Sequence, residues 1–169
     1  MKKYLLIILA VLMLFLVSCN KKDNNTDKGN GKTDEGFVDF NDLLGDNYMY
    51  ARIDDKEIKI KLEDNSSTKR LLELLEEENI VFKADDYQNF EKVGDIGTAI
   101  TKNDSEVDAK CFDVLLYNGR NITFIYGTNS YSYTVLGKVE GISEAEYKEF
   151  LKAGNGEVSI TLSKTSKNK

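Results

Sequence analysis

The sequence predicts a mainly β fold, either an antiparallel β-barrel or a strongly curved sheet, with two helices at its ends. Short segments with alternating apolar and polar residues recur along the chain, as in residues 57–62 and 158–162. The links between these segments are mostly too short for the crossovers that parallel strands need. Asn118-Gly119 joins two of the segments, and this dipeptide tolerates the positive φ of a type I′ hairpin turn.

The chain begins with the pattern of a secretory leader. Two lysines follow Met1, residues 4–17 are apolar, and the run ends at Ser18-Cys19. This end, with Leu16 three residues before Cys19, resembles the lipobox of bacterial lipoproteins. The resemblance implies that residues 1–18 are a signal peptide, and that Cys19 carries a diacylglycerol thioether and becomes the mature N-terminus.

Two other interpretations of this leader are an uncleaved membrane anchor and a leader with an incidental cysteine. The apolar run is about fourteen residues, short of the ~20 that a membrane-spanning helix needs. A polar segment follows the run directly, which is typical of a tether. Residues 19–47 are therefore expected to be the lipidated cysteine and a flexible polar tether.

The globular pattern follows this tether and ends before a short disordered tail at residues 164–169. Apolar alternation or β-rich composition predicts strands at residues 49–53, 57–62, 80–82, 112–117, 122–126, 131–139 and 158–162. Residues 101–109 are polar and are expected to form a loop. Residues 87–100 show neither the alternation of a strand nor the spacing of a helix, because Gly94 and Gly97 interrupt the pattern.

Two segments have the apolar spacing of helices. The first is expected to begin at Asn65 or Ser66, either of which can cap a helix, and to end near Glu77. The second is expected at residues 144–153, because Ser143 and Glu146 have the spacing of a capping box.

Composition excludes several classes of function. The chain carries 23 basic and 29 acidic residues, so it repels phosphate backbones and is not expected to bind nucleic acid. It contains no His, which removes the usual general base and zinc ligand. No metal-ligand spacing, phosphate loop or nucleophile motif is present, so no metal and no cofactor are expected. Cys111 is expected to be a buried structural thiol.

Three segments resemble the small bacterial cyclophilin-like domain of uncharacterised proteins. The first is residues 62–69 leading into the leucine-rich helix, and the second is Glu91-Lys92-Val93-Gly94-Asp95-Ile96 followed by the polar loop and Phe112-Asp113-Val114. The third is Phe124-Ile125-Tyr126 followed by Tyr131-Ser132-Tyr133-Thr134-Val135-Leu136-Gly137-Lys138-Val139. The resemblance implies a small closed antiparallel β-barrel over residues 48–163, capped by the helix after Asn65. The chain departs from the pattern at Ser66, where similar domains usually carry proline.

The resemblance also raises the activity of cyclophilins, which isomerise X-Pro bonds with an arginine beside the amide. Arg52 lies in a predicted strand and is the catalytic candidate if the chain is an isomerase. The sequence around it lacks the Phe-x-Arg type of motif, and the His and Trp of the proline pocket are absent. Prolyl isomerase activity is therefore the less favoured interpretation, and no catalytic residue is assigned.

Four residues are candidates for binding a ligand: Glu91, Tyr126, Tyr131 and Tyr133. The tyrosines offer flat contact area with a polar tip, and Tyr131 and Tyr133 must point to the same side of a strand. They either line a pocket or fill the interior of a small barrel. The carboxylate of Glu91 either binds a cationic or hydroxyl-bearing ligand or forms an ordinary surface ion pair.

The sequence thus predicts an extracytoplasmic protein of the cell envelope, held on the membrane by the lipid on Cys19. Its domain is expected to be a non-catalytic binding or accessory module for a peptide, a protein or a small molecule. Two alternatives stay open: a degenerate peptidyl-prolyl isomerase acting on exported proteins, and a carrier of small ligands. The sequence does not indicate an oligomeric state.

Overall fold

The structure is a computed structural model that describes residues 47–167. The predicted signal peptide, the lipidation site Cys19 and almost all of the predicted tether lie outside the described residues. Within the described part, no helix has the length and apolar character required to cross a membrane.

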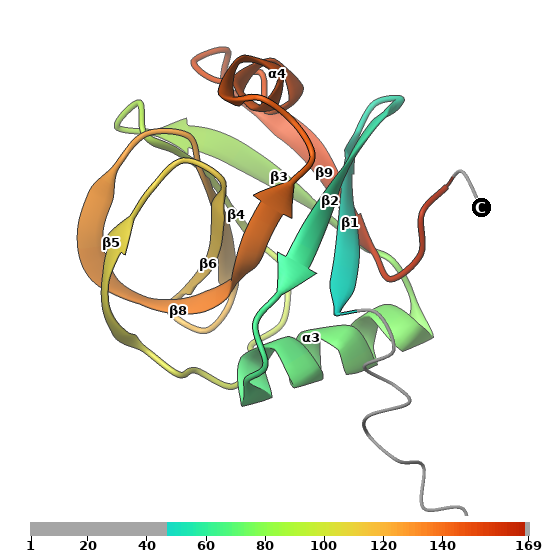
Figure 1. The fold of residues 1–169 in the computed structure, drawn as a ribbon. Helices are drawn as coiled ribbons and strands as arrows, with labels where there is room; N and C mark the ends of the chain where they lie inside the picture. Colours follow the sequence, from blue (N-terminus) through green and yellow to red (C-terminus); the bar gives the residue numbers. More distant parts are fainter. Residues whose placement is uncertain (1–46, 168–169) are drawn as a thin grey trace, which may run out of the picture. The chain divides into compact units, whose positions relative to one another are not determined.

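The described chain forms nine strands and two helices (Figure 1). The strands are β1 Tyr48–Ile53, β2 Lys56–Leu62, β3 Ile80–Tyr87, β4 Glu91–Asp95, β5 Ser105–Ala109, β6 Asp113–Tyr117, β7 Asn121–Ile125, β8 Asn129–Glu140 and β9 Val158–Ser163. The helices are α3 Ser66–Glu77 and α4 Glu144–Phe150.

All strand pairs are antiparallel, and the order along the sheet is β2-β1-β9-β3-β4-β7-β6-β8-β5. A further pairing of β2 with β8 joins the two ends, so every described strand except β5 belongs to a hydrogen-bonded ring. Gly137 lies at this junction opposite Leu62, and a Cβ there would come within 2.2 Å of the Lys61 carbonyl oxygen. Glycine therefore permits the close approach that completes the ring.

The main hydrophobic core lies on the inner face of the ring and under the two helices. Met49, Ile60 and Phe124 represent the strands in this core, and all three side chains are fully buried. Leu71 of α3 and Tyr147 of α4 belong to the same cluster. Figure 1 shows α3 at the lower end of the ring and α4 at the upper end, so the helices close the two openings of the core.

A second, smaller cluster lies on the opposite face of β7, β6 and β8. Ala109, Leu115, Ile125 and Tyr133 are its buried members. The first half of β8 pairs with β5 alone, whereas the second half pairs with β6 and β2. The β5–β8 ribbon thus curves away from the ring and covers part of its outer surface (Figure 1).

The local signals in the sequence are confirmed where the backbone geometry depends on them. Asn118 and Gly119 have φ values of 52° and 74°, as a type I′ hairpin turn requires. Asn65 is the N-cap of α3, and Ser143 and Glu146 form the capping box of α4. The mainly β, antiparallel character and the helices at the ends are likewise confirmed.

The secondary structure differs from the predictions in three segments. Residues 105–109 form β5 rather than a loop, because their backbone pairs with β8. Residues 87–100, for which no element is predicted, contain β4. In β4, Gly94 packs so closely against β3 that a Cβ would lie 2.1 Å from the Lys83 carbonyl oxygen. The second helix ends at Phe150, and residues 151–154 continue as turns.

Part of the predicted tail contacts the domain. Lys164 pairs with Glu76 of α3. The Ser166 hydroxyl and the Lys167 backbone N–H donate hydrogen bonds to the carboxylate of Glu57 on β2. The described part of residues 164–169 is thus held against α3 and β2.

Candidate functional site

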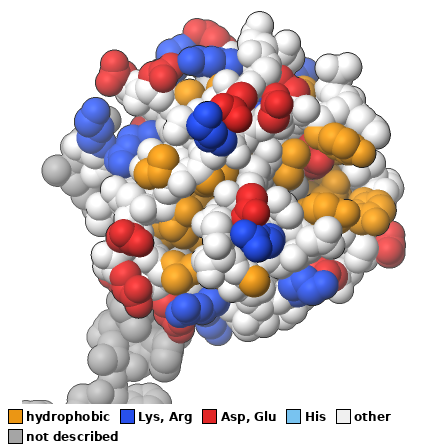
Figure 2. Space-filling view, turned by 180° about the vertical axis from the view of Figure 1, so that it is seen from behind, with side chains coloured by type: hydrophobic (Ala, Val, Ile, Leu, Met, Phe, Trp, Pro, Cys, Tyr) orange, Lys and Arg blue, Asp and Glu red, His pale blue; other side chains and the backbone are white. Residues whose placement is uncertain are grey.

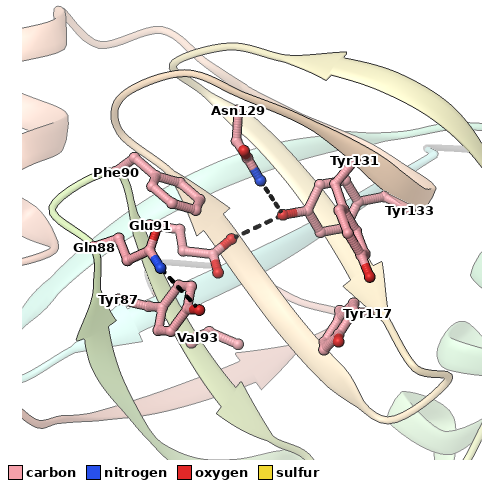
Figure 3. Close-up of a pocket in the computed structure, with 9 residues that line it drawn as sticks. All are labelled: Tyr87, Gln88, Phe90, Glu91, Val93, Tyr117, Asn129, Tyr131 and Tyr133. Carbon is pink, nitrogen blue, oxygen red and sulfur yellow. Dashed lines mark hydrogen bonds between the residues drawn. The ribbon is translucent and has the colours of Figure 1, made fainter.

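A cavity of about 420 Å³ opens on the outer face of the ring, between β4 and the β5–β8 ribbon. The residues that line it come from β3, the β3–β4 turn, β4, β6 and the first half of β8 (Figure 3): Tyr87, Gln88, Phe90, Glu91, Val93, Tyr117, Asn129, Tyr131 and Tyr133. Aromatic rings form most of this lining, and Glu91 is the only charged residue among the described residues that line it.

Two groups of aromatic side chains face each other across Glu91 (Figure 3). On one side, the rings of Tyr87 and Phe90 meet edge to face, with their centroids 5.9 Å apart. On the other side, Tyr117, Tyr131 and Tyr133 form a triangle of edge-to-face contacts with centroid separations of 5.7 to 6.2 Å. Such contacts fix the orientation of the rings, so the walls of the cavity are formed by ordered flat surfaces.

The Glu91 carboxylate lies in the wall between these two groups and is largely buried. The residue is 6 % exposed. Its Oε2 accepts a hydrogen bond of 2.6 Å from the Thr123 hydroxyl and a longer one of 3.4 Å from the Tyr133 hydroxyl. Burial raises the pKa of Glu91 above its ordinary value, and these two hydrogen bonds oppose the shift only in part.

A chain of hydrogen bonds connects Glu91 to the start of strand β8. The Asn129 amide donates to the Tyr133 hydroxyl at 2.9 Å, and that hydroxyl donates to Glu91. Burial raises the pKa of Tyr133, and the nearby Glu91 carboxylate acts in the same direction. Tyr133 therefore stays a neutral hydrogen-bond donor at physiological pH.

Strand register explains why Glu91 faces the cavity while its neighbour Lys92 faces the core. Glu91 lies opposite Ile125 of the outer cluster, and Lys92 lies opposite Phe124 of the main core. Because successive side chains alternate between the faces of a strand, these two charges point in opposite directions. Of the two alternatives for Glu91, the ordinary surface ion pair is wrong, because the carboxylate is buried and accepts its hydrogen bonds from hydroxyl groups among the described residues.

A buried ion pair between Lys92 and Asp86 lies on the core side of β4, opposite to the cavity, and supports the site. The Lys92 side chain is fully buried, and its Nζ lies 2.8 Å from the carboxylate of Asp86. The same Nζ donates to the carbonyl oxygen of Gly156 at 2.7 Å. This pair joins β3, β4 and the segment before β9.

The position of Phe90 depends on a close backbone approach. Its carbonyl oxygen accepts hydrogen bonds from the backbone N–H groups of Tyr126 and Gly127 at 2.8 and 2.9 Å. A Cβ at Gly127 would come within 2.9 Å of the Phe90 Cβ. The glycine thus lets the β3–β4 turn lie against the end of β7 and hold the Phe90 ring at the cavity.

The structure separates the three candidate tyrosines. Tyr131 and Tyr133 lie on the same side of β8, as their spacing predicts, and both line the cavity, with exposed fractions of 51 % and 4 %. Tyr126 instead belongs to the main core, where its hydroxyl donates to Asp86 at 2.9 Å. The alternative of core filling therefore describes Tyr126, and the alternative of pocket lining describes the other two.

Arg52 does not join this group of residues. It alternates along β1 with the core residues Ala51 and Ile53, and its side chain lies 3.6 Å from the carboxylate of Glu57. In the ring, β9 and β3 separate β1 from β4 on one side, and β2 separates β1 from β8 on the other. The structure therefore provides no shared site for Arg52 and the cavity residues.

Several lining residues carried no sequence signal of their own. Tyr87, Phe90 and Tyr117 come from segments of different character, and only the ring topology brings them together. Tyr117 was the easiest to place, because it directly precedes the Asn118-Gly119 turn at the end of a predicted strand. The role of Asn129 was not visible, because turn residues are commonly Asn.

The surface around the cavity is apolar for an otherwise charged domain. Tyr87 and Tyr131 are two of the three large hydrophobic residues that are exposed within the described range; the third is Val81. In Figure 2, which views the domain from behind Figure 1, hydrophobic side chains gather at the right, on the side where β5 and β8 lie. Within residues 47–167, no group of three acidic or Cys side chains converges to hold a metal ion.

Cys111 lies away from the cavity. Its side chain packs against the main core but is only partly buried, so the predicted burial of this thiol is incomplete. Burial raises its pKa, and the neighbouring Glu144 carboxylate acts in the same direction. The thiol is therefore held in its less reactive protonated form, in agreement with a structural role.

Comparison with known proteins agrees with this architecture. A family model described as the cyclophilin-like family matches residues 51–163. The solution structure of a hypothetical protein from Archaeoglobus fulgidus is similar, with a TM-score of 0.54 and 15 % sequence identity, over 70 % of this chain and 94 % of that one. At this identity the likeness concerns the fold alone. No curated protein matches the sequence.

Proposed function

The chain belongs to the cyclophilin-like family, and from that premise we propose that it is an envelope lipoprotein whose domain is a non-catalytic binding module. The observation that carries the proposal is the aromatic cavity on the outer face of the ring, with one buried carboxylate in its wall. The proposed occupant is a small molecule or a side chain of similar size.

The size and chemistry of the cavity support this assignment. Small-molecule sites are concave, largely apolar and lined by a few polar groups, with volumes of about 300–1,000 Å³. A cavity of about 420 Å³ with five aromatic rings and three hydrogen-bonding side chains fits this description. The rings are held by one another and by the backbone, so little ordering is left for a ligand to induce.

The absence of a catalytic constellation within the described residues favours binding over turnover. Among the described residues that line the cavity there is no arginine, histidine, serine or cysteine, and its one hydroxyl–carboxylate contact, Tyr133 to Glu91, is long at 3.4 Å. Arg52, the residue that an isomerase would use, lies on a different side of the ring and pairs with Glu57.

Membrane attachment is the second part of the proposal and rests on the sequence. The leader, the cysteine that follows it and the polar segment after the cysteine are arranged as in bacterial lipoproteins. Two or more acyl chains on Cys19 would hold the domain stably, whereas a single chain would not. The ligand would then be met on the extracytoplasmic side of the membrane.

The test is a nuclear magnetic resonance titration of the ¹⁵N-labelled full chain in an uncharged detergent. Butan-1-ol, phenol, butylammonium and pentanoate serve as small probes of different charge. We expect at least one of them to shift the backbone amide signals of the cavity residues. Tyr131→Ala should weaken that binding, whereas Val81→Ala, at an exposed residue that does not line the cavity, should leave it unchanged. Shifts that gather elsewhere, or that Tyr131→Ala does not affect, would contradict the proposal.

A further inference from the structure

The chemistry of the cavity also indicates the charge of its ligand, and Glu91 is the starting point. Oε2 of this carboxylate accepts both of its hydrogen bonds, from Thr123 and from Tyr133. No residue of the described part of the chain donates to Oε1. Oε1 is not among the fully buried atoms that lack a partner, so this oxygen of a largely buried carboxylate stays accessible to solvent and can accept a hydrogen bond from a ligand.

The charge of Glu91 is also uncompensated. None of the described residues that line the cavity is Lys or Arg. The buried lysine next to it in sequence, Lys92, faces the core and is committed to Asp86 and Gly156. Burying a carboxylate without a cationic partner is costly, so the site favours a ligand that supplies the positive charge.

The aromatic lining favours the same kind of ligand. Tyr87 and Phe90 lie on one side of Glu91 and Tyr117, Tyr131 and Tyr133 on the other (Figure 3). Aromatic rings attract cations through the negative potential over their faces, and this attraction grows when water is excluded. A carboxylate between two groups of rings combines a hydrogen-bond acceptor with such surfaces.

We propose that the cavity binds a small organic cation with an N–H donor, a primary or secondary alkylammonium, whose nitrogen donates to Glu91 Oε1 while its alkyl part packs against the surrounding rings. This inference rests on the proposed binding function and assigns the ligand class to the same site. A neutral hydroxyl compound reaches the same oxygen without compensating its charge, and an anion is repelled by it.

The protonation state of Glu91 links binding to pH. A cation lowers the pKa of a neighbouring carboxyl, so an ammonium ligand opposes the upward shift that burial causes. The groups that face Glu91 are the hydroxyls of Thr123 on β7 and Tyr133 on β8, with Tyr126 of the β7–β8 turn also within electrostatic range. None of these three groups is a cation that would keep Glu91 ionised. Protonation of Glu91 at acidic pH removes the negative charge that attracts an ammonium ligand, so binding is expected to weaken there.

The test compares four probes that share a butyl chain: butylammonium, butyltrimethylammonium, butan-1-ol and pentanoate. Each is titrated into the ¹⁵N-labelled full chain in an uncharged detergent, with the amides of Glu91, Tyr117 and Tyr131 as reporters. Butylammonium should bind at least about tenfold more tightly than butan-1-ol, because it forms a charge-assisted hydrogen bond. Butyltrimethylammonium, which keeps the charge and lacks the N–H, should bind more weakly than butylammonium, and pentanoate should bind least.

Two matched variants isolate the role of the carboxylate. Glu91→Gln keeps the shape and the acceptor for Thr123 and should reduce butylammonium affinity to that of butan-1-ol. Glu140→Gln removes the same charge from an exposed position at the end of β8 and should leave the affinity unchanged. Tyr131→Ala, at a half-exposed ring, should weaken butylammonium binding in a folded protein even if Glu91→Gln does not fold.

The outcomes separate this inference from the binding function. If butan-1-ol or pentanoate binds in the cavity as tightly as butylammonium, or Glu91→Gln leaves butylammonium binding intact, the ligand class is wrong while the binding site stands. Equal affinity for butyltrimethylammonium would remove the N–H donor from the proposal. If none of the four probes nor phenol shifts the reporters, both this inference and the proposed function fail.

Discussion

The Tyr133 hydroxyl donates a hydrogen bond to Glu91 Oε2 at 3.4 Å, although the two residues are 42 positions apart in the sequence. Their strands are not neighbours, because β7 and β6 lie between β4 and β8 in the ring. The contact forms because the first half of β8 leaves the ring and curves over its outer face with β5. The long strand β8 therefore both completes the ring and forms one wall of the cavity.

The first prediction concerns the pH dependence of stability at Glu91. Burial raises the pKa of this carboxyl in the folded state above its ordinary value of 4.5. The folded protein then binds more protons than the unfolded chain between these two values, so ionisation of Glu91 lowers the free energy of unfolding as pH rises. Glu91→Gln cannot ionise and should gain stability relative to the parent protein as pH rises through this window.

Urea unfolding across about pH 4 to 8 measures this difference. Glu140→Gln removes an exposed carboxylate and serves as the control, for which no relative gain with pH is expected. Parallel pH profiles for the parent and Glu91→Gln would show that Glu91 ionises as freely in the folded protein as in the unfolded chain.

The second prediction concerns the ion pair behind the cavity. Lys92→Met should lower the free energy of unfolding by about 3 kcal/mol, because it leaves the Asp86 carboxylate without its cation in a largely buried position. Lys83→Met removes a lysine that pairs with Glu157 on the exposed surface of neighbouring β3, and it should have little effect. Similar losses in the two variants would mean that the buried pair is not a structural support of the site.

The third prediction concerns isomerase activity. Because Arg52 lies outside the cavity and pairs with Glu57, we expect no acceleration of X-Pro isomerisation in a proline-peptide assay beyond that of the Arg52→Ala variant. A clear activity of the parent protein that Arg52→Ala abolishes would favour the degenerate isomerase and reject a purely binding role.

The fourth prediction concerns the membrane anchor. Mass spectrometry of the protein produced in a bacterial host should find the chain beginning at Cys19 with a diacylglycerol group on its sulfur. Cys19→Ser should retain the leader and lose the lipid, since the thiol is the acceptor. An unmodified Cys19 together with residues 1–18 still attached would reject the lipoprotein assignment and the extracytoplasmic location that depends on it.

The sequence predicted those elements whose signals are local. The Asn118-Gly119 turn and the capping residues Asn65 and Ser143 act within a few positions of the chain, so residue type alone indicates them. Strand β5 was missed because it pairs only with the curved half of β8 and buries little beyond Ala109. Strand β4 was missed because Gly94, which interrupts the pattern, is required by close packing against β3.

The candidate site was predictable only in part for a related reason. The two-residue spacing of Tyr131 and Tyr133 places both on one side of β8, and the structure confirms this. Whether that side met solvent or a cavity depended on how the β5–β8 ribbon curves, which no local pattern specifies. The burial of Glu91 depends on the same curvature, and so a residue of a usually exposed type became the central polar group of the cavity.

A crystal structure of the protein with butylammonium bound would test directly whether Glu91 holds an ammonium ligand in the cavity. We expect the ammonium nitrogen at about 2.8 Å from Glu91 Oε1, as in charge-assisted hydrogen bonds, with the butyl chain between the rings of Phe90 and Tyr131. A butylammonium ion bound elsewhere, or in the cavity with its nitrogen turned away from Glu91, would contradict this expectation.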